Sequence, residues 1–469
     1  MLVLNNAEIV TGDGRRKPFR GSIAIEDGLI AAVSPHDLAG GTGDTVIDLG
    51  GRLTVPGAID AHAHATAPGP RFASGTPGVP LAESLGNLRR HLTQGHTTVV
   101  DLDGFKSPAD HAQVSLVQPV KVEMSSVHFD PMFGAADACD GSGLSDLHRG
   151  LTAQEMKEHG AVVLGEVGAG MTLGGGGQDY IYIPAAIEQA TGVRIVQAQA
   201  QQLKYAALGR HIRSGDPDRS RLTQLIEEFG LSPLTVDDLV GIIEQSVLPS
   251  IELALDGLLR SASLAVELQL PTLVHNSAPS DDVARQAAEI AGGLFIGGHT
   301  NHPTFSVDEA LASARWIRDH GGHVEVDTFD LWTGGTGTSR SGMHECLIAL
   351  AQADMIDIIA TDYAAGHWDG MWEMAAAFVQ AGLAPIERAV AMATGNLARA
   401  IPRIGATRGV LTPGRAADLV VTSPRTLADV ELVIVDGEVA YSSAHRPLSL
   451  PQSVRSPRPA ISPEEGDTQ

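Results

Sequence analysis

Val55-Pro56-Gly57-Ala58-Ile59-Asp60-Ala61-His62-Ala63-His64 is the most informative segment of the sequence, because it ends an apolar run with two histidines two residues apart. On a β-strand, residues i and i+2 point to the same face, so both imidazoles can reach one metal ion. Pro56-Gly57 suits the entry into a first strand better than the middle of a sheet. Two histidines in a lone His-x-His pair are more often polar side chains whose hydrogen bonds are made within the protein than metal ligands. The rest of the chain must therefore supply the further evidence for a metal site.

Four further apolar runs end on residue types that bind metals. They are residues 161–166, 271–275, 294–299 and 356–362, which end in Glu166, His275, His299 and Asp362. In a (β/α)₈ barrel the carboxyl ends of the strands converge on one mouth, so residues distant in sequence become neighbours there. Each side chain alone could equally be a capping or core polar group. All of them falling at expected strand ends is improbable by chance.

The sequence therefore predicts an α/β fold built around a (β/α)₈ TIM-like barrel. The candidate metal ligands at its mouth are His62, His64, Glu166, His275, His299 and Asp362. Four imidazoles and two carboxylates are enough to hold two divalent metal ions.

Composition limits the classes of function. The formal net charge of −24 over 469 residues argues against nucleic-acid binding, which usually needs a basic surface. Only Cys139 and Cys346 are present, too few for a disulfide framework, so a reducing cytoplasm is the expected location. Because the chain has no basic leader and no apolar run near 18 residues, no membrane partner is expected.

Changes in periodicity divide the chain. Short apolar strands alternate with turns in residues 1–54 and again in 407–443, so we expect one composite small β-sandwich domain built from both chain ends. The barrel would span residues 55–406, more than the ~250 residues of a typical barrel. The surplus lies in an insertion at about 178–262. Residues 444–469, rich in Pro, Ser and Glu, are expected to form a disordered or subunit-wrapping tail.

The insertion has the periodicity of helices. We expect them at residues 197–209, 219–229, 236–245 and 251–268. Because the segment leaves and re-enters the barrel beside strands that carry candidate ligands, it should cover the mouth and shape the substrate pocket. Contacts between subunits of a homo-oligomer are a further expected role.

Several motifs carry a resemblance to a known family. They are residues 56–64, Gly165-Glu166-Val167-Gly168, Gly298-His299-Thr300-Asn301-His302-Pro303, Met392-Ala393-Thr394-Gly395-Asn396 and residues 409–420. The chain resembles the metal-dependent amidohydrolases of the urease-related superfamily, and most closely the enamidases, over nearly its whole length outside the insertion and tail. The long insertion departs from the enamidase pattern.

The resemblance implies a dinuclear metal centre. One ion would be held by His62, His64 and Asp362, the other by His275 and His299, and Glu166 would bridge them. Many relatives bridge their ions with a carbamylated lysine on this strand, but no lysine ends it here, so a plain carboxylate is expected. The imidazole-rich set favours zinc, and iron or manganese also fits mixed nitrogen and oxygen ligation.

The expected reaction is hydrolysis of a C–N amide bond in a small molecule, and the enamidase resemblance implies a cyclic amide. Asp362 would take the proton from the metal-bridging hydroxide as it attacks and pass it to the leaving nitrogen. An N-acyl amino acid deacylase or linear amidase on the same site is the alternative. Mononuclear deaminases of the superfamily place a glutamate three residues after the strand-five histidine. His275-Asn276-Ser277-Ala278 has none, so deamination is less favoured.

Substrate contacts are expected from residues on loops near the predicted mouth. The candidates are His128, Trp332, Arg340, Tyr363, His367 and Trp368.

Overall fold

The structure is a computed structural model. It describes residues 1–469 except 72–77, 116, 140–142, 169–172, 174–176, 214, 329–344, 363–369 and 444–469. The expected tail, residues 444–469, lies outside the described residues.

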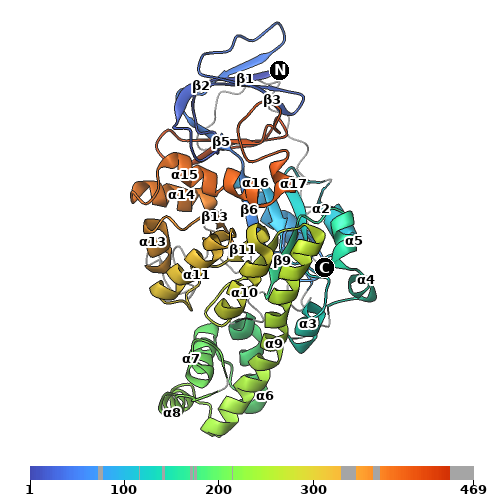
Figure 1. The fold of residues 1–469 in the computed structure, drawn as a ribbon, viewed down its shortest axis with the longest axis vertical. Coiled ribbons are helices and arrows are strands. Elements are labelled where there is room, and N and C mark those ends of the chain that lie inside the picture. Colours follow the sequence, from blue (N-terminus) through green and yellow to red (C-terminus); the bar gives the residue numbers. More distant parts are fainter. Residues whose placement is uncertain are drawn as a thin grey trace, which may run out of the picture.

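Within the described residues, eight parallel strands form the barrel, each beside its neighbour in sequence (Figure 1). They are β6 (Ala58–Ala63), β7 (His96–Asp101), β8 (Lys121–Ser126), β9 (Val163–Val167), β10 (Thr272–His275), β11 (Phe295–Gly298), β12 (His323–Asp327) and β13 (Ile358–Ala360). Ile59, Val100, Leu273 and Ile296 form part of the packed interior. The predicted (β/α)₈ barrel is confirmed.

Helices connect these strands and cover the barrel. They are α1 (Leu81–Thr93), α2 (Pro108–Ser115), α3 (Met132–Cys139), α4 (Asp146–Arg149), α5 (Ala153–Glu158), α10 (Asp281–Ala291), the 3₁₀ helix η2 (Gly292–Leu294), α11 (Val307–Asp319), α13 (Glu345–Gln352), α14 (Met371–Gln380), α15 (Ile386–Met392), α16 (Gly395–Ala400) and α17 (Pro402–Gly405). Helix α11 illustrates why these segments form helices. Ser306 and Glu309 form a capping box at its start, and Ala310, Ala314 and Ile317 bury one face.

A second sheet joins the two ends of the chain. Its strands are β1 (Leu2–Ile9), β2 (Phe19–Glu26), β3 (Leu29–Ser34), β4 (Thr45–Asp48), β5 (Leu53–Pro56), β14 (Leu419–Thr422), β15 (Val430–Val435) and β16 (Glu438–Ser442). Strand β5 pairs with β1 on one side and with β14 on the other, which links the N-terminal and C-terminal strands. Leu4, Ile23, Leu419 and Ile434 share one buried cluster. The expected β-structure built from both chain ends is confirmed.

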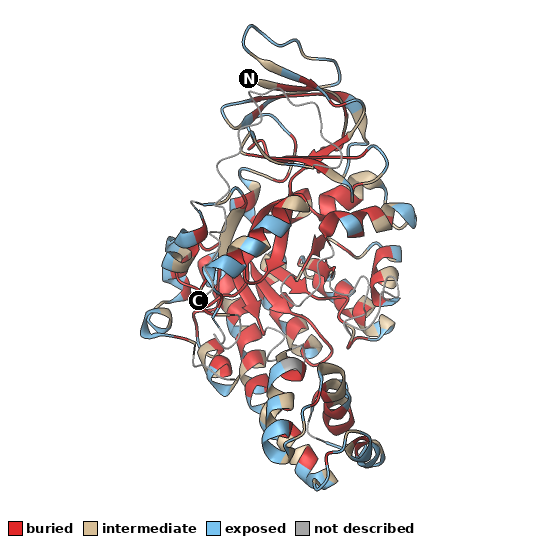
Figure 2. Ribbon diagram, turned by 180° about the vertical axis from the view of Figure 1, so that it is seen from behind, coloured by how far each residue is buried: buried red, intermediate tan, exposed pale blue. Residues whose placement is uncertain are grey.

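The insertion consists of helices that begin at the end of the molecule opposite this second sheet, and the last of them runs back along the barrel beside α3 and α10 (Figure 1). They are the π-helix η1 (Gln178–Tyr182), α6 (Ile183–Thr191), α7 (Gln197–Leu208), α8 (Arg219–Glu228) and α9 (Val236–Leu268). Figure 2 shows exposed faces along them, in contrast to the buried strands of the barrel. Among the described residues, no helix is long and apolar enough to cross a membrane.

The expected break near residues 246–250 is wrong, because α9 runs unbroken for 33 residues through Pro249. An interior proline removes one backbone hydrogen bond and usually ends or kinks a helix. Val247, Ile251 and Ala254 on either side of it are buried. Packing of this apolar face therefore outweighs the local cost of the proline.

A buried carboxylate joins the first and last strands of the barrel. Strands β6 and β13 lie at the two ends of the hydrogen-bonded strand order. Asp60 Oδ1 accepts hydrogen bonds from the backbone N–H groups of His62 and Thr361, each at 3.1 Å, and Oδ2 accepts one from Thr361 Oγ1 at 2.5 Å. Asp60 thereby fixes the segment before Asp362 against the strand that carries His62 and His64.

Candidate metal centre

Glu166, on β9, lies at the centre of four imidazoles. Its Oε2 is 3.5 Å from His62 Nε2 and 3.4 Å from His64 Nε2. Its Oε1 is 2.7 Å from His275 Nδ1 and 3.3 Å from His299 Nε2. All five side chains are buried. Each carboxylate oxygen therefore faces one pair of histidines, and the two pairs come from opposite halves of the sequence.

Asp362 lies beside the first pair. Its Oδ1 is 3.5 Å from His64 Nε2 and 3.9 Å from His62 Nε2. Asp362 and His299 have φ angles of 46° and 55°, in the left-handed region that non-glycine residues seldom adopt. Such strained residues cluster at functional sites, where the surrounding structure holds them in place. The structure thus brings together all six residues that the strand-end pattern selected.

Three carboxylates outside this cluster orient the histidines. Glu325 Oε1 is 2.9 Å from His62 Nδ1, and Asp327 Oδ2 is 2.6 Å from His299 Nδ1. Asp103 Oδ1 is 3.0 Å from His64 Nδ1. With Nδ1 held by a carboxylate, each ring turns its Nε2 toward Glu166, which is the usual arrangement of metal-binding histidines.

Sequence reasoning missed these three carboxylates. Glu325 and Asp327 belong to β12, where charged and apolar residues alternate in His323-Val324-Glu325-Val326-Asp327. Two acids two residues apart at the end of a strand point to the same face, as His62 and His64 do on β6. This spacing could have identified Glu325 and Asp327 as candidate residues of the site.

The charges of the cluster support one another. Burial lowers the pKa of His62, but the carboxylates of Glu325 and Glu166 outweigh it and raise this pKa to about 9. Burial raises the pKa of Glu166, but the charge of His62 and the hydrogen bond from His275 hold it well below its usual range. Without metal, a protonated His62 and an ionised Glu166 thus stabilise each other, whereas burial and the neighbouring His299 lower the pKa of His275.

The residues fit a divalent cation. Atoms of His62, His64 and Asp362 lie within 4.8 Å of one another, as do atoms of His62, Glu166 and His299. His62 Nε2 is buried and makes no hydrogen bond with any described residue. An unpaired buried polar atom is costly, and a metal ion would use its lone pair. His275 differs, because its Nδ1 faces Glu166 and its buried Nε2 has no hydrogen-bond partner in the described part of the chain.

His302 lies next to this cluster, with its ring centroid 5.3 Å from that of His275 and 6.1 Å from that of His299. Its Nδ1 accepts a hydrogen bond from the backbone N–H of Thr304 at 3.2 Å and lies 2.7 Å from Thr304 Oγ1. The N–H of Ala278 donates to that same hydroxyl at 3.0 Å, which orients it toward His302. An accepting Nδ1 leaves the ring hydrogen on Nε2. His302 therefore offers an N–H donor beside the cluster.

His128 is buried two residues after the end of β8. Its ring contacts Phe105 and Phe133, with centroids 5.7 Å and 6.1 Å away, and its Nδ1 is 3.1 Å from Ser126 Oγ. No described hydrogen bond, ion pair or ring contact joins it to the six residues. The other candidate substrate residues, Trp332, Arg340, Tyr363, His367 and Trp368, lie outside the described residues.

The chain belongs to the amidohydrolase family, because the model of that family matches residues 53–441. It is therefore a hydrolase of a class that acts on carbon–nitrogen bonds, and the resemblance carried by its motifs is confirmed.

Two relatives and one solved structure are similar to this chain. An enamidase from Eubacterium barkeri is 28% identical over 174 residues, which are 36% of this chain and 42% of that protein. A 5-methylthioadenosine/S-adenosylhomocysteine deaminase from Nitratidesulfovibrio vulgaris (strain DP4) is 46% identical over 67 residues, 14% of this chain and 15% of that protein. The chain thus matches less than half the length of either relative. The crystal structure of an enamidase superposes with a TM-score of 0.53 at 18% identity, covering 98% of both chains, and shows the same fold.

Proposed function

We propose that this protein hydrolyses the C–N bond of a small cyclic amide at a centre of two divalent metal ions. One observation carries the proposal: the two oxygens of Glu166 face two separate histidine pairs, at 2.7–3.5 Å. A carboxylate with this environment suits a bridge between two cations. The similarity to an enamidase supports the substrate class.

His62, His64 and Asp362 would hold one ion and His275 and His299 the other. Bound ions of this kind polarise a carbonyl group and lower the pKa of water toward neutrality. Zinc suits four imidazoles with two carboxylates, and iron or manganese also fits this set.

Asp362 is the proposed carrier of the proton. Burial raises the pKa of its carboxyl, but the hydrogen bond from His64 and the charges of His299 and His62 hold it below the ordinary value. The ionised carboxylate can take a proton from the attacking water and deliver it to the amide nitrogen. Because an amide nitrogen leaves poorly unless it is protonated, this transfer is worth roughly 10²–10⁴-fold in rate.

His302 is the proposed donor to the substrate. Burial and the neighbouring His275 and His299 hold the pKa of its ring well below the usual range, so the ring is neutral at pH 7. Its Nε2–H can donate to the carbonyl oxygen as negative charge develops there. Fixed donors at such positions act without reorganising during the reaction.

Two other substrate classes are the alternatives to a cyclic amide. A linear amide or an N-acyl amino acid would use the same residues and differ only in the surrounding loops. Deamination is supported by the short match to a deaminase, and weakened by the sequence His275-Asn276-Ser277-Ala278, which carries no acid three residues after the histidine.

A substrate panel with the metal-loaded enzyme tests the proposal. Lactams, imides and cyclic ureas are compared with N-acyl amino acids and aminated purines, and ring opening is followed by mass change. We expect turnover of at least one cyclic amide, absent in the matched Glu166→Gln variant. Turnover of only acyclic amides would reject the cyclic substrate class, and ammonia release from purines would reject amide hydrolysis.

We also propose that the insertion covers the mouth of the barrel. Arg210 Nη1, after α7, donates to the carbonyl of Thr304 at 2.6 Å, and His211 Nδ1 is 3.2 Å from the carbonyl of Ala278. Thr304 and Ala278 lie on the loops that follow the strands of His299 and His275. Ile181 and Val196 on the insertion are 42% and 66% exposed, which suits contacts within a homo-oligomer.

Replacing α6 to α8, residues 183–228, by a Gly-Ser linker tests this placement and leaves α9, which packs on β9 and β10, in the protein. We expect KM to rise at least about tenfold with metal content unchanged, because remote contacts that position substrate are lost. A shortened enzyme with normal metal content and unchanged kinetics would reject the role.

The presence of only two cysteines favours a reducing location, and we propose the cytoplasm.

A further inference from the structure

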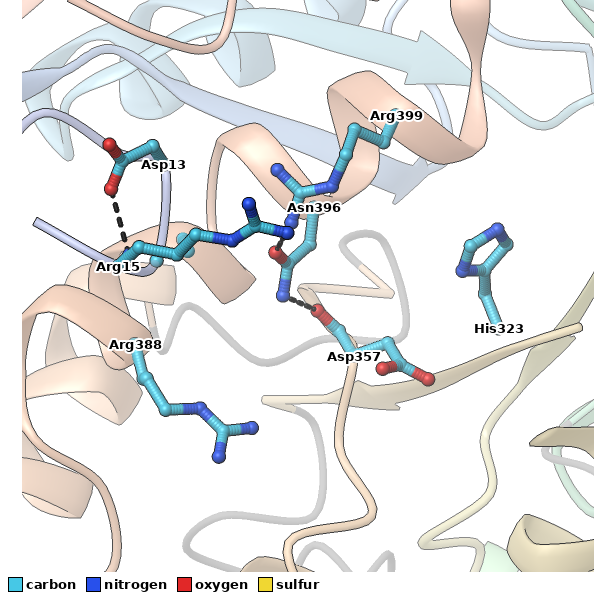
Figure 3. Close-up of a pocket in the computed structure, with 9 residues that line it drawn as sticks. Asp13, Arg15, His323, Asp357, Arg388, Asn396 and Arg399 are labelled. Atoms are coloured by element: carbon cyan, nitrogen blue, oxygen red, sulfur yellow. Dashed lines mark hydrogen bonds between the residues drawn. The ribbon is translucent and has the colours of Figure 1, made fainter. Parts of the chain in front are cut away.

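A cavity lies at the amino ends of the barrel strands, on the side opposite the Glu166 cluster. Its volume is about 270 Å³, and Arg15, Arg388, Arg399, His323 and Asp357 are among the residues that line it (Figure 3). His323 begins β12, whose other end carries Asp327 beside His299. A strand rises about 3.3 Å per residue, so roughly 13 Å separates the cavity from the candidate metal centre.

The cavity has more positive than negative charge available. Among the described residues, neither Arg15 nor Arg399 takes part in an ion pair, and Arg388 pairs with Asp354, which does not line the cavity. Two guanidinium groups facing one space repel each other unless an anion lies between them. This is unusual in a chain whose formal net charge is −24.

The two carboxylates that line the cavity are already bonded elsewhere. Asp357 accepts hydrogen bonds from Arg318 Nη2 at 2.5 Å and from Arg318 Nε at 3.0 Å. Asp13 Oδ1 accepts from the backbone N–H groups of Arg15 and Arg16, both at 2.8 Å. Asp357 is therefore paired with Arg318, and Asp13 leaves one negative charge against the guanidinium groups of Arg15 and Arg399.

Hydrogen bonds hold part of the cavity wall in place. The Asn396 side chain donates from Nδ2 to the carbonyl of Asp357 at 2.7 Å and accepts from Arg399 Nη2. The guanidinium groups of Arg15 and Arg399 both extend toward Asn396 (Figure 3). Ligand sites gain affinity when their polar groups are held before binding.

His323 adds no charge of its own at neutral pH. Burial lowers the pKa of its ring, Asp357 offsets part of this, and the charges of Arg399 and Arg318 lower it further. The positive charge of the cavity therefore comes from its arginines.

We propose that this cavity binds a small oxyanion, a phosphate or carboxylate group, through Arg15 and Arg399. Arginine presents two parallel N–H donors that match both groups. A volume of about 270 Å³ admits such an ion, and it is below the roughly 300–1,000 Å³ of pockets for drug-sized ligands. The proposal is independent of the proposed amide hydrolysis.

Isothermal titration tests the proposal on the full-length, metal-loaded protein. The probes are sodium phosphate and sodium malonate, at ionic strength matched with chloride. We expect saturable binding of at least one probe, and the stronger one identifies the preferred oxyanion. The double variant Arg15→Ala/Arg399→Ala should bind at least about tenfold more weakly, because two charge-assisted contacts are lost. Its circular dichroism should be unchanged, since both side chains are exposed.

Two controls make the result decisive. Arg89→Ala removes an exposed arginine on α1 outside the cavity and should leave binding unchanged. Glu166→Gln alters the candidate metal centre and should also leave binding unchanged. This control distinguishes anion binding in the cavity from anion binding to the metal ions. Absence of saturable binding, equal binding by the double variant, or loss of binding in Glu166→Gln would each overturn the proposal.

Discussion

The two ends of the barrel differ in the burial and pairing of their charged side chains. At the carboxyl ends of the strands, Glu166 is almost completely buried and its oxygens face four imidazoles. At the amino ends, Arg15 and Arg399 are exposed and face a cavity whose own acids are bonded to other groups. Strand β12 contributes residues to both ends, and Asp357 and Asp362 flank β13 at its two ends.

Burial explains the difference. In a buried site every charge needs a partner, so a cluster of imidazoles and acids is stable only with protons or metal ions among them. In an open cavity water screens the charges, and unpaired arginines persist without a ligand. The side chains therefore indicate bound cations at the carboxyl ends of the strands and a bound anion at the amino ends.

Asp362→Asn should produce the largest loss. The amide cannot carry the proton and is a weaker ligand, so we expect turnover to fall by more than the ~10²–10⁴ of acid–base loss alone. The fold and most of the metal should be retained. Steady-state kinetics and circular dichroism check this, with Asp319→Asn, a change to an exposed acid on α11, as the control. Near-normal turnover in Asp362→Asn would remove this residue from the mechanism.

His302→Phe should have the next largest effect. It keeps a ring of similar size but removes the Nε2–H donor, so we expect kcat to fall about 10²-fold with metal content unchanged. His302→Gln, which restores an N–H group, should recover part of the rate. If kcat is unchanged in the Phe variant, His302 only packs against His275 and has no part in the reaction.

The pH dependence of the metal-free protein should be the mildest effect. The pKa of His62 is raised from its ordinary 6.5 to about 9 in the folded state. The stabilisation from this protonated ring is complete below pH 6.5 and is lost as the pH rises through 9. Calorimetry of chelated protein should therefore show Tm falling between pH 6.5 and 9.

Metal ions should weaken this trend, because they replace the protons on the imidazoles and bind more tightly at higher pH. Metal-loaded protein measured in the same buffers is the matched control, and its Tm should fall less. A metal-free Tm that rises across this range would contradict the assigned charges.

The barrel and the six-residue cluster could be predicted because each residue ends an apolar run. Alternation fixes the face of a strand, and the parallel topology brings the strand ends together. Glu325 and Asp327 escaped prediction because acids that alternate with valines also fit a strand with one solvated face. His302 lies in a loop, where periodicity carries no information.

Other features depend on contacts that local sequence does not encode. The helix through Pro249 forms because its neighbours pack, although the local signal favours a break. The anion cavity joins the loop with Arg15 to α16 with Arg399, and only the folded chain brings them together. His128, expected to contact substrate from a loop, has its ring against Phe105 and Phe133 instead, a contact that the sequence alone does not reveal.

Metal content per chain is the most direct test of the account. Elemental analysis of fully active protein should give about two divalent ions per chain, chelation should abolish activity, and adding metal back should restore it. The Glu166→Gln variant should hold less metal, because the proposed bridge is lost. One ion or none per chain in fully active protein, with activity that survives chelation, would contradict a centre built around Glu166.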